Sequence, residues 1–155
     1  MPDYQIKVVE RPAEKVVGLK VRTDMAKSAE DCPRLWYQDF GPRMPEVASF
    51  PSYSYGASLW IEGETFDYWA ALPYRPGDPI PSGMALLDLT DGLYAECPVD
   101  KLEDLAGAYQ HIFAVWGPSS GYDFAIGVPS YELYPADHME NGRLTLYMPL
   151  KKNSA

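Results

Sequence analysis

A single glutamate stands among tyrosines near the end of the chain. Glu132 lies in the sequence Tyr-Glu-Leu-Tyr of residues 131–134, and the segment expected to pair with it, residues 143–150, carries Tyr147. A carboxylate among aromatic rings is costly to bury unless it is paired or hydrogen-bonded. It could attract a cationic ligand, or it could act as a general base on water while Tyr147 donates a hydrogen bond to a developing oxyanion. A partly exposed glutamate paired with a lysine or arginine is the alternative that the pattern leaves open.

Length and charge bound the kind of protein. The 155 residues suit one domain with a core, and a hydrophobic content of 46% excludes a disordered chain. The formal charge of −9 argues against nucleic acid as a partner, because nucleic-acid-binding proteins need a basic face. The same charge favours cations through long-range attraction, although acidity can also serve solubility alone. No apolar run has the roughly 18 residues that span a membrane, and the N-terminus lacks a signal-peptide pattern. We therefore expect a cytoplasmic protein without membrane contact.

Metal and cofactor motifs do not occur in the sequence. Cys32 and Cys97 fit no zinc-binding spacing, so we expect two free thiols. His111 and His138 have no partners at metal-ligand spacing. Neither a glycine-rich phosphate loop nor a nucleophile-elbow serine is present. We expect no metal and no cofactor.

Hydrophobic periodicity predicts an α+β domain with a mostly antiparallel sheet and two main helices. Pro33 suits the first turn of the first helix, and Asp100 with Glu103 forms a capping box before the second. Gly41 and Gly117, each followed by proline, should end these helices. The predicted helices cover residues 32–40 and 101–116, and the predicted strands cover residues 4–9, 15–22, 54–62, 65–73, 84–89, 93–99, 124–135 and 143–150.

The same order of elements occurs twice. An offset of 76 residues, from Phe40 to Trp116, aligns two Gly-Pro helix ends and also aligns Tyr55 with Tyr131. We interpret this as two strand-helix-strand-strand modules, about residues 1–75 and 84–151, within a single domain of residues 1–155. Pseudo-twofold symmetry between the modules predicts a ligand cleft where they meet.

The repeat makes the surroundings of Glu132 asymmetric. Gly56 stands at the position equivalent to Glu132, and Ala71 at the position equivalent to Tyr147. One module thus offers a carboxylate and a tyrosine where the other offers small residues. Packing alone needs no such asymmetry, whereas a pocket needs room on one side and polar groups on the other.

Short segments in a fixed order extend over essentially the whole chain: Arg34–Tyr37, Gly41–Arg43, Tyr55–Ser58, Phe66–Ala70, Tyr94–Ala95, Tyr131–Tyr134 and Leu146–Pro149. In these segments the sequence resembles the GyrI-like small-molecule-binding domain, which is also the effector domain of some multidrug-responsive regulators. The resemblance implies the duplicated fold predicted above. The chain is too short for an added helix-turn-helix domain, so it resembles the stand-alone members.

The resemblance also implies a function and a site. Glu132 is expected at the floor of an aromatic pocket for planar, hydrophobic, often cationic drug-like molecules, with Tyr147 beside it. Each aromatic face can attract a cation by about 0.5–2 kcal/mol. The further wall residues that we expect, from the resemblance and from shared strand faces, are Tyr134, Trp69, Tyr68, Tyr109, Trp36 and Trp60.

Other functions stay open at this point. Some stand-alone members are hydrolases of cyclopropane-containing electrophiles, which implies Glu132 as general base and Tyr147 as oxyanion donor. A protein partner bound through the acidic surface is possible, although no motif indicates one. Haem, bound by distant relatives of this fold, is disfavoured because we expect no histidine in the cleft. The sequence decides neither for a monomer nor for a homodimer.

Overall fold

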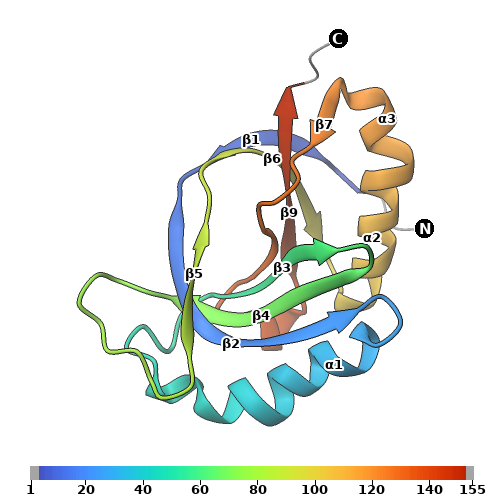
Figure 1. The fold of residues 1–155 in the computed structure, drawn as a ribbon. Coiled ribbons are helices and arrows are strands. Elements are labelled where there is room, and N and C mark those ends of the chain that lie inside the picture. Colours follow the sequence, from blue (N-terminus) through green and yellow to red (C-terminus); the bar gives the residue numbers. More distant parts are fainter. Residues whose placement is uncertain (1–3, 153–155) are drawn as a thin grey trace.

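A curled sheet forms the body of the computed structural model, which describes residues 4–152 (Figure 1). All its strand pairs are antiparallel. The strands are β1 (Lys7–Arg11), β2 (Glu14–Asp24), β3 (Ser54–Glu62), β4 (Thr65–Pro73), β5 (Ala85–Leu89), β6 (Gly92–Val99), β7 (Tyr122–Phe124), β8 (Ser130–Tyr134) and β9 (Leu144–Lys152).

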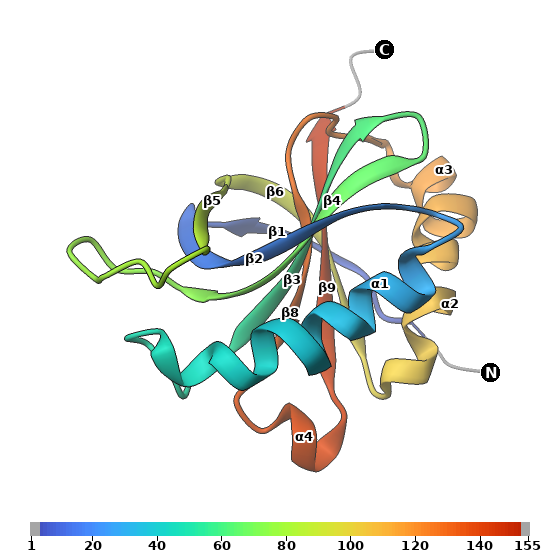
Figure 2. The same cartoon turned by 60° about the horizontal axis from the view of Figure 1, so that its bottom comes forward.

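Two helical stretches cover the outer side of the curl, one over each half of the sheet (Figures 1 and 2). The first packs on β2 and β4, and the second packs on β6. The predicted α+β class with two main helices is therefore confirmed. The helical segments are α1 (Ser28–Arg34), η1 (Leu35–Phe40), η2 (Gly41–Glu46), η3 (Leu102–Asp104), α2 (Leu105–His111), η4 (Ile112–Trp116), α3 (Gly117–Ser120) and α4 (His138–Asn141).

The strand order is symmetric about the centre of the sheet. It runs β1-β6-β9-β8-β3-β4-β2-β5, with β7 joined to β9. If β1, β2, β3 and β4 are exchanged with β5, β6, β8 and β9, the order reads the same from either end. Gly56 and Glu132, which the repeat makes equivalent, face each other directly across β3 and β8. The axis that relates the two halves therefore passes through this residue pair.

Both main helices change to π-helical geometry at equivalent places, η1 and η4. A π-turn closes on the carbonyl five residues earlier, and here Gly41 donates to Trp36 and Gly117 donates to Ile112. A Cβ atom would stand 2.4 Å from the Trp36 carbonyl oxygen at Gly41, and 2.9 Å from that of Ile112 at Gly117. The repeated Gly-Pro pairs thus follow wide helical turns that leave no space for a side chain.

Several predicted boundaries are wrong in detail. The first helix begins at Ser28, so Pro33 lies inside α1 and not in its first turn. Asp100 does not cap the second helical stretch, which begins as a 3-10 turn at Leu102 without a side-chain capping bond. The predicted strand 124–135 is two strands, β7 and β8, because Phe124 pairs with β9 separately from the β8 residues. The limits of the modules stay a prediction.

Strand alternation sorts the sheet's side chains onto two faces. On the outer face they form two cores with the helices, which contain Phe40 and Ile112 respectively. On the inner face of the curl they form a third core that contains no helix residue. Its buried aromatic members are Tyr55, Trp69, Tyr94, Tyr131 and Tyr147. The inner face is therefore packed mainly by rings.

We predict that Gly18→Ala lowers the free energy of unfolding by about 1–3 kcal/mol, as overpacked sites do. Gly18 lies opposite Ala71, and a Cβ atom there would stand 1.9 Å from the backbone oxygen of Ala70. Gly56→Ala is the comparison, because its Cβ would meet the Tyr68 hydroxyl, at the far end of a side chain, and not a backbone atom. Urea unfolding should show the larger loss for Gly18→Ala, and the opposite order would contradict the prediction.

Candidate functional site

Glu132 lies at the centre of the outer face, where the two halves of the sheet meet. Only 5% of its surface is exposed. Burial raises the pKa of this carboxyl, and hydrogen bonds from Tyr109 and Tyr134 oppose the rise. Burial thus disfavours the charged form of Glu132, and the two phenols favour it.

Two phenols donate to the two oxygens of Glu132. Tyr109 of α2 donates to Oε2 at 2.5 Å, and Tyr134 donates to Oε1 at 2.5 Å. Tyr134 follows Glu132 by two residues in β8, so both side chains lie on the same face. Among residues 4–152, no Lys, Arg or His nitrogen lies within 4.0 Å of this carboxylate. The phenols disperse the negative charge without neutralising it.

Two further aromatic residues complete this group. The Trp36 indole of η1 donates to the Tyr68 hydroxyl at 2.8 Å. Its ring also meets the ring of Tyr134 edge-on, with the centroids 5.6 Å apart. A Cβ atom at Gly56 would stand 2.3 Å from the Tyr68 hydroxyl oxygen and 3.1 Å from Glu132 Oε1. The glycine across from Glu132 therefore leaves space for the polar ends of its neighbours.

The structure thus brings together five of the residues expected from the sequence, which we name the Glu132 cluster: Glu132, Tyr134, Tyr109, Tyr68 and Trp36. Two members, Tyr68 and Trp36, lie in the predicted first module. The other three members, Glu132, Tyr134 and Tyr109, lie in the predicted second module. The cluster lies where we expected a cleft, but its own side chains fill the space. A ligand can reach the carboxylate only if a side chain moves.

Cys32 is a neighbour of Glu132 that we did not include among the site residues. Burial raises the pKa of its thiol to about 12, and the charges of Glu132 and Asp31 contribute to the rise. The thiol therefore stays protonated and is a poor nucleophile. Cys32 precedes Trp36 by four residues on one helical stretch. This spacing could have indicated that Cys32 lies on the same helical face as Trp36.

Tyr147 does not belong to the Glu132 cluster. It stands opposite Tyr131 in the pairing of β8 with β9, whereas Glu132 stands opposite Leu146. Because successive strand residues point to opposite faces, Tyr147 lies on the inner face, where it donates to Glu96 at 2.9 Å. The expectation of one site shared by Glu132 and Tyr147 is wrong, and so is a hydrolytic mechanism that uses both.

The other two tryptophans are also displaced from the expected pocket. Trp69 lies on the inner face, with the Lys20 ammonium 5.6 Å from the centre of its ring. Trp60 lies near the end of β3, where its ring packs against that of Phe66 at a tilt of 46°, with the centroids 4.6 Å apart. A shared strand face did not bring Trp60 to Glu132, because residues along one face extend over the whole length of the sheet.

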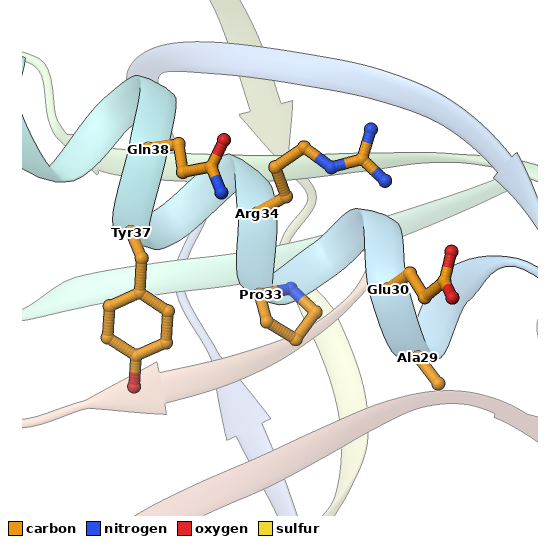
Figure 3. A pocket seen from close by; sticks show the side chains of 6 residues that line it. All are labelled: Ala29, Glu30, Pro33, Arg34, Tyr37 and Gln38. Carbon is orange, nitrogen blue, oxygen red and sulfur yellow. The ribbon is translucent and has the colours of Figure 1, made fainter.

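An open surface depression lies elsewhere, on the outer side of the first helical stretch (Figure 3). It contains no member of the Glu132 cluster, and its lining is Ala29, Glu30, Pro33, Arg34, Tyr37 and Gln38. Tyr37 is 68% exposed there. We place the candidate site at the Glu132 cluster because a buried, uncompensated charge is stronger evidence of a binding role than an open hollow.

The described part of the chain offers neither a cluster of metal ligands nor a membrane-spanning helix. Within residues 4–152, no group of three or more His, Cys, Asp or Glu side chains could hold a metal ion. No helix in that range is long and apolar enough to cross a membrane.

Comparison with known proteins identifies the family. The family model of the GyrI-like small molecule binding domain matches residues 4–151. The chain therefore belongs to the GyrI-like small-molecule-binding family. No curated protein sequence is significantly similar to it.

Solved structures share the fold at low sequence identity. An integron cassette protein of Vibrio cholerae is 14% identical, with a TM-score of 0.68 over 94% of this chain and 95% of that one. The protein SAV2435, solved bound to tetraphenylphosphonium, is 13% identical, with a TM-score of 0.70 over 97% and 94%. The C-terminal domain of EcmrR is 14% identical, with a TM-score of 0.66 over 97% and 99%.

We predict that Glu132→Gln changes the pH dependence of stability in a defined direction. A carboxyl with a raised pKa in the folded state lowers stability as pH rises from its unfolded value of about 4.3 through the folded pKa. The glutamine variant should therefore gain stability relative to the parent between pH 4 and pH 7, by about 1.4 kcal/mol for each unit of raised pKa.

Asp67→Asn is the matched control, with the opposite sign. The hydrogen bond from Arg22 lowers the pKa of Asp67, so this variant should lose stability relative to the parent as pH rises from 3 to 7. Urea unfolding across this pH range measures both differences. A Glu132→Gln curve that stays parallel to the parent would contradict the assignment.

Proposed function

We propose that this domain binds planar, hydrophobic, cationic small molecules at the Glu132 cluster. The observation that carries the proposal is a buried carboxylate that two phenols hold and no described cation neutralises. A cationic ligand supplies the missing charge in a medium of low dielectric constant, where the attraction is strong. The faces of Tyr68, Tyr134 and Trp36 add cation–π and stacking contacts.

Trp36 decides how a ligand reaches Glu132. It is only partly buried, whereas Tyr68 and Glu132 are each about 5% exposed. Its indole already contacts the hydroxyl of Tyr68 and the ring of Tyr134, so it fills the space that a flat ligand would take. Moving it breaks one hydrogen bond, worth about 0.5–1.5 kcal/mol, which ligand contacts can offset.

Two further observations support a cationic ligand. The formal charge of −9 attracts cations from a distance. The related SAV2435 was solved with tetraphenylphosphonium, an aromatic monocation. We extend this ligand class to the present chain because the Glu132 cluster offers both a carboxylate and aromatic walls.

Turnover of a reactive electrophile at the same cluster is a second candidate function. It is favoured by the raised pKa of Glu132, which suits a general base, and by the two phenols beside it, which can turn from the carboxylate to a developing oxyanion once Glu132 has taken the proton. Incubation with a cyclopropane-containing alkylator, followed by mass spectrometry, detects the addition of water. Turnover that persists in Glu132→Gln would contradict this role.

Glu132→Gln should weaken the binding of a cationic dye at least tenfold, while a neutral dye of the same shape should lose less than threefold. We expect low-micromolar affinity of the parent for the cationic dye, measured by fluorescence titration. Glu46→Gln is the matched control, since it removes one exposed negative charge and should leave both affinities nearly unchanged. Equal losses for the cationic and neutral dyes would remove the charge argument.

The cluster should also prefer cations that carry no hydrogen-bond donors. Each Glu132 oxygen already accepts a hydrogen bond from a phenol. An ammonium N–H can therefore bond to the carboxylate only by displacing a tyrosine hydroxyl. We predict that benzyltrimethylammonium binds several-fold more tightly than benzylammonium, as measured by calorimetry. Tighter binding of benzylammonium would contradict this prediction, because it would show that an ammonium readily displaces the phenol hydrogen bonds.

A further inference from the structure

A second group of charged and aromatic side chains lies on the inner face, at the corner between β1 and β2. Arg11 is the last residue of β1 and Glu14 is the first residue of β2. Both side chains are partly buried. They reach tyrosines of the inner face, which is separated from the Glu132 cluster by the thickness of the sheet.

Glu14 is held in the same way as Glu132. Tyr53 donates to Oε2 at 2.8 Å, and Tyr55 donates to Oε1. The two rings are perpendicular, with an interplanar angle of 89° and centroids 5.7 Å apart. Tyr55 is fully buried, whereas Tyr53 is 39% exposed. The carboxylate and the two rings therefore form a corner that is reachable from solvent on one side.

Arg11 lies against the same layer of tyrosines. The carbon of its guanidinium is 4.4 Å from the centre of the Tyr147 ring and 5.9 Å from that of Tyr131. Its Nε donates to the hydroxyl of Tyr131 at 3.2 Å. Within residues 4–152 this is its one hydrogen bond, so the two terminal nitrogens of the guanidinium have N–H groups to offer.

These two opposite charges do not pair with each other. Within the described chain, no carboxylate oxygen lies within 4.0 Å of an Arg11 nitrogen, and no cationic nitrogen lies that close to Glu14. The tyrosines that bind them, Tyr55 and Tyr131, have ring centroids 5.3 Å apart. Burial and the hydrogen bond to Glu14 raise the pKa of Tyr55, and the positive charge of Arg11 opposes part of that rise, so the field of Arg11 reaches a donor of Glu14. A ring layer thus keeps a carboxylate and a guanidinium near each other but apart.

We propose that this corner binds a small zwitterion that carries a quaternary ammonium and a carboxylate, of the betaine class. The methylated ammonium would lie against the exposed ring of Tyr53 beside Glu14, because aromatic rings attract quaternary cations. The carboxylate would accept hydrogen bonds from the terminal nitrogens of Arg11. Each unpaired charge of the protein then gains a partner in one molecule.

The geometry selects this class over simpler ions. A lone cation at Glu14 is repelled by Arg11, and a lone anion at Arg11 is repelled by Glu14, because the two tyrosine rings that hold these charges are in contact. A primary ammonium would compete with Tyr53 and Tyr55 for the oxygens of Glu14, whereas a quaternary ammonium has no N–H and displaces neither phenol. The proposal does not rest on ligand binding at the Glu132 cluster.

The test is calorimetric titration of the full chain with glycine betaine, choline and acetate. We expect betaine to bind at least tenfold more tightly than choline or acetate, which each carry one of its charges. Glu14→Gln and Arg11→Gln should each lower betaine affinity at least tenfold. Arg11→Gln should raise the affinity for choline, because a repulsive charge is removed. This change of sign distinguishes recognition of both charges from a general loss of structure.

Controls separate the two faces and guard against misfolding. Glu132→Gln should leave betaine affinity within twofold of the parent, and so should Glu10→Gln, which removes an exposed charge near Arg11. Tyr53→Ala removes the exposed wall without opening the core, and it should weaken betaine at least fivefold with an unchanged melting temperature. Absence of betaine binding in the parent, equal affinity for choline, or full binding in Glu14→Gln or Tyr53→Ala would each overturn the proposal.

Discussion

The hydrogen bonds from Tyr109 and Tyr134 to Glu132 are the interaction on which the centre of the molecule depends. A carboxylate with 5% of its surface exposed, and no described cation beside it, would otherwise be too costly to keep charged. The second helical stretch provides one donor and β8 provides the other, so both hydrogen bonds to the carboxylate require the helix to be docked on the sheet. The space for these groups comes from Gly56, directly across the axis of the fold.

The two halves of the sheet share one architecture, but they carry different side chains around the axis. Both modules keep the π-turn followed by Gly-Pro, because a side chain at Gly41 or Gly117 would meet a carbonyl oxygen. The residues around the axis have changed. Trp36 belongs to the Glu132 cluster, where its ring contacts that of Tyr134. Its equivalent in the repeat, Ile112, is fully buried in the core of its own half. An exact twofold would place two carboxylates against each other, and like charges in a buried site repel.

The alternation of β8 gives the sheet two chemically different faces. Tyr131 points to the inner face and Glu132 to the outer face, so neighbouring residues serve separate clusters. On each face a glutamate accepts hydrogen bonds from two phenols: Glu132 on the outer face and Glu14 on the inner face. The difference lies in the neighbouring charge. Glu14 has Arg11 in its vicinity and Glu132 has no described basic partner, which is why we propose ligands of different net charge for the two clusters.

The sequence by itself determined the fold class, the limits of β3 and β4, and the equivalence of Gly56 and Glu132 in the repeat. These follow from local patterns, such as alternation, turn residues and a fixed offset. Only the tertiary structure decided that Tyr147 and Trp69 lie on the face opposite to Glu132, and that Cys32 lies near it. The physical reason is strand register. Alternation has a period of two, so a slip of one residue between β8 and β9 exchanges the faces, and no local pattern specifies that register.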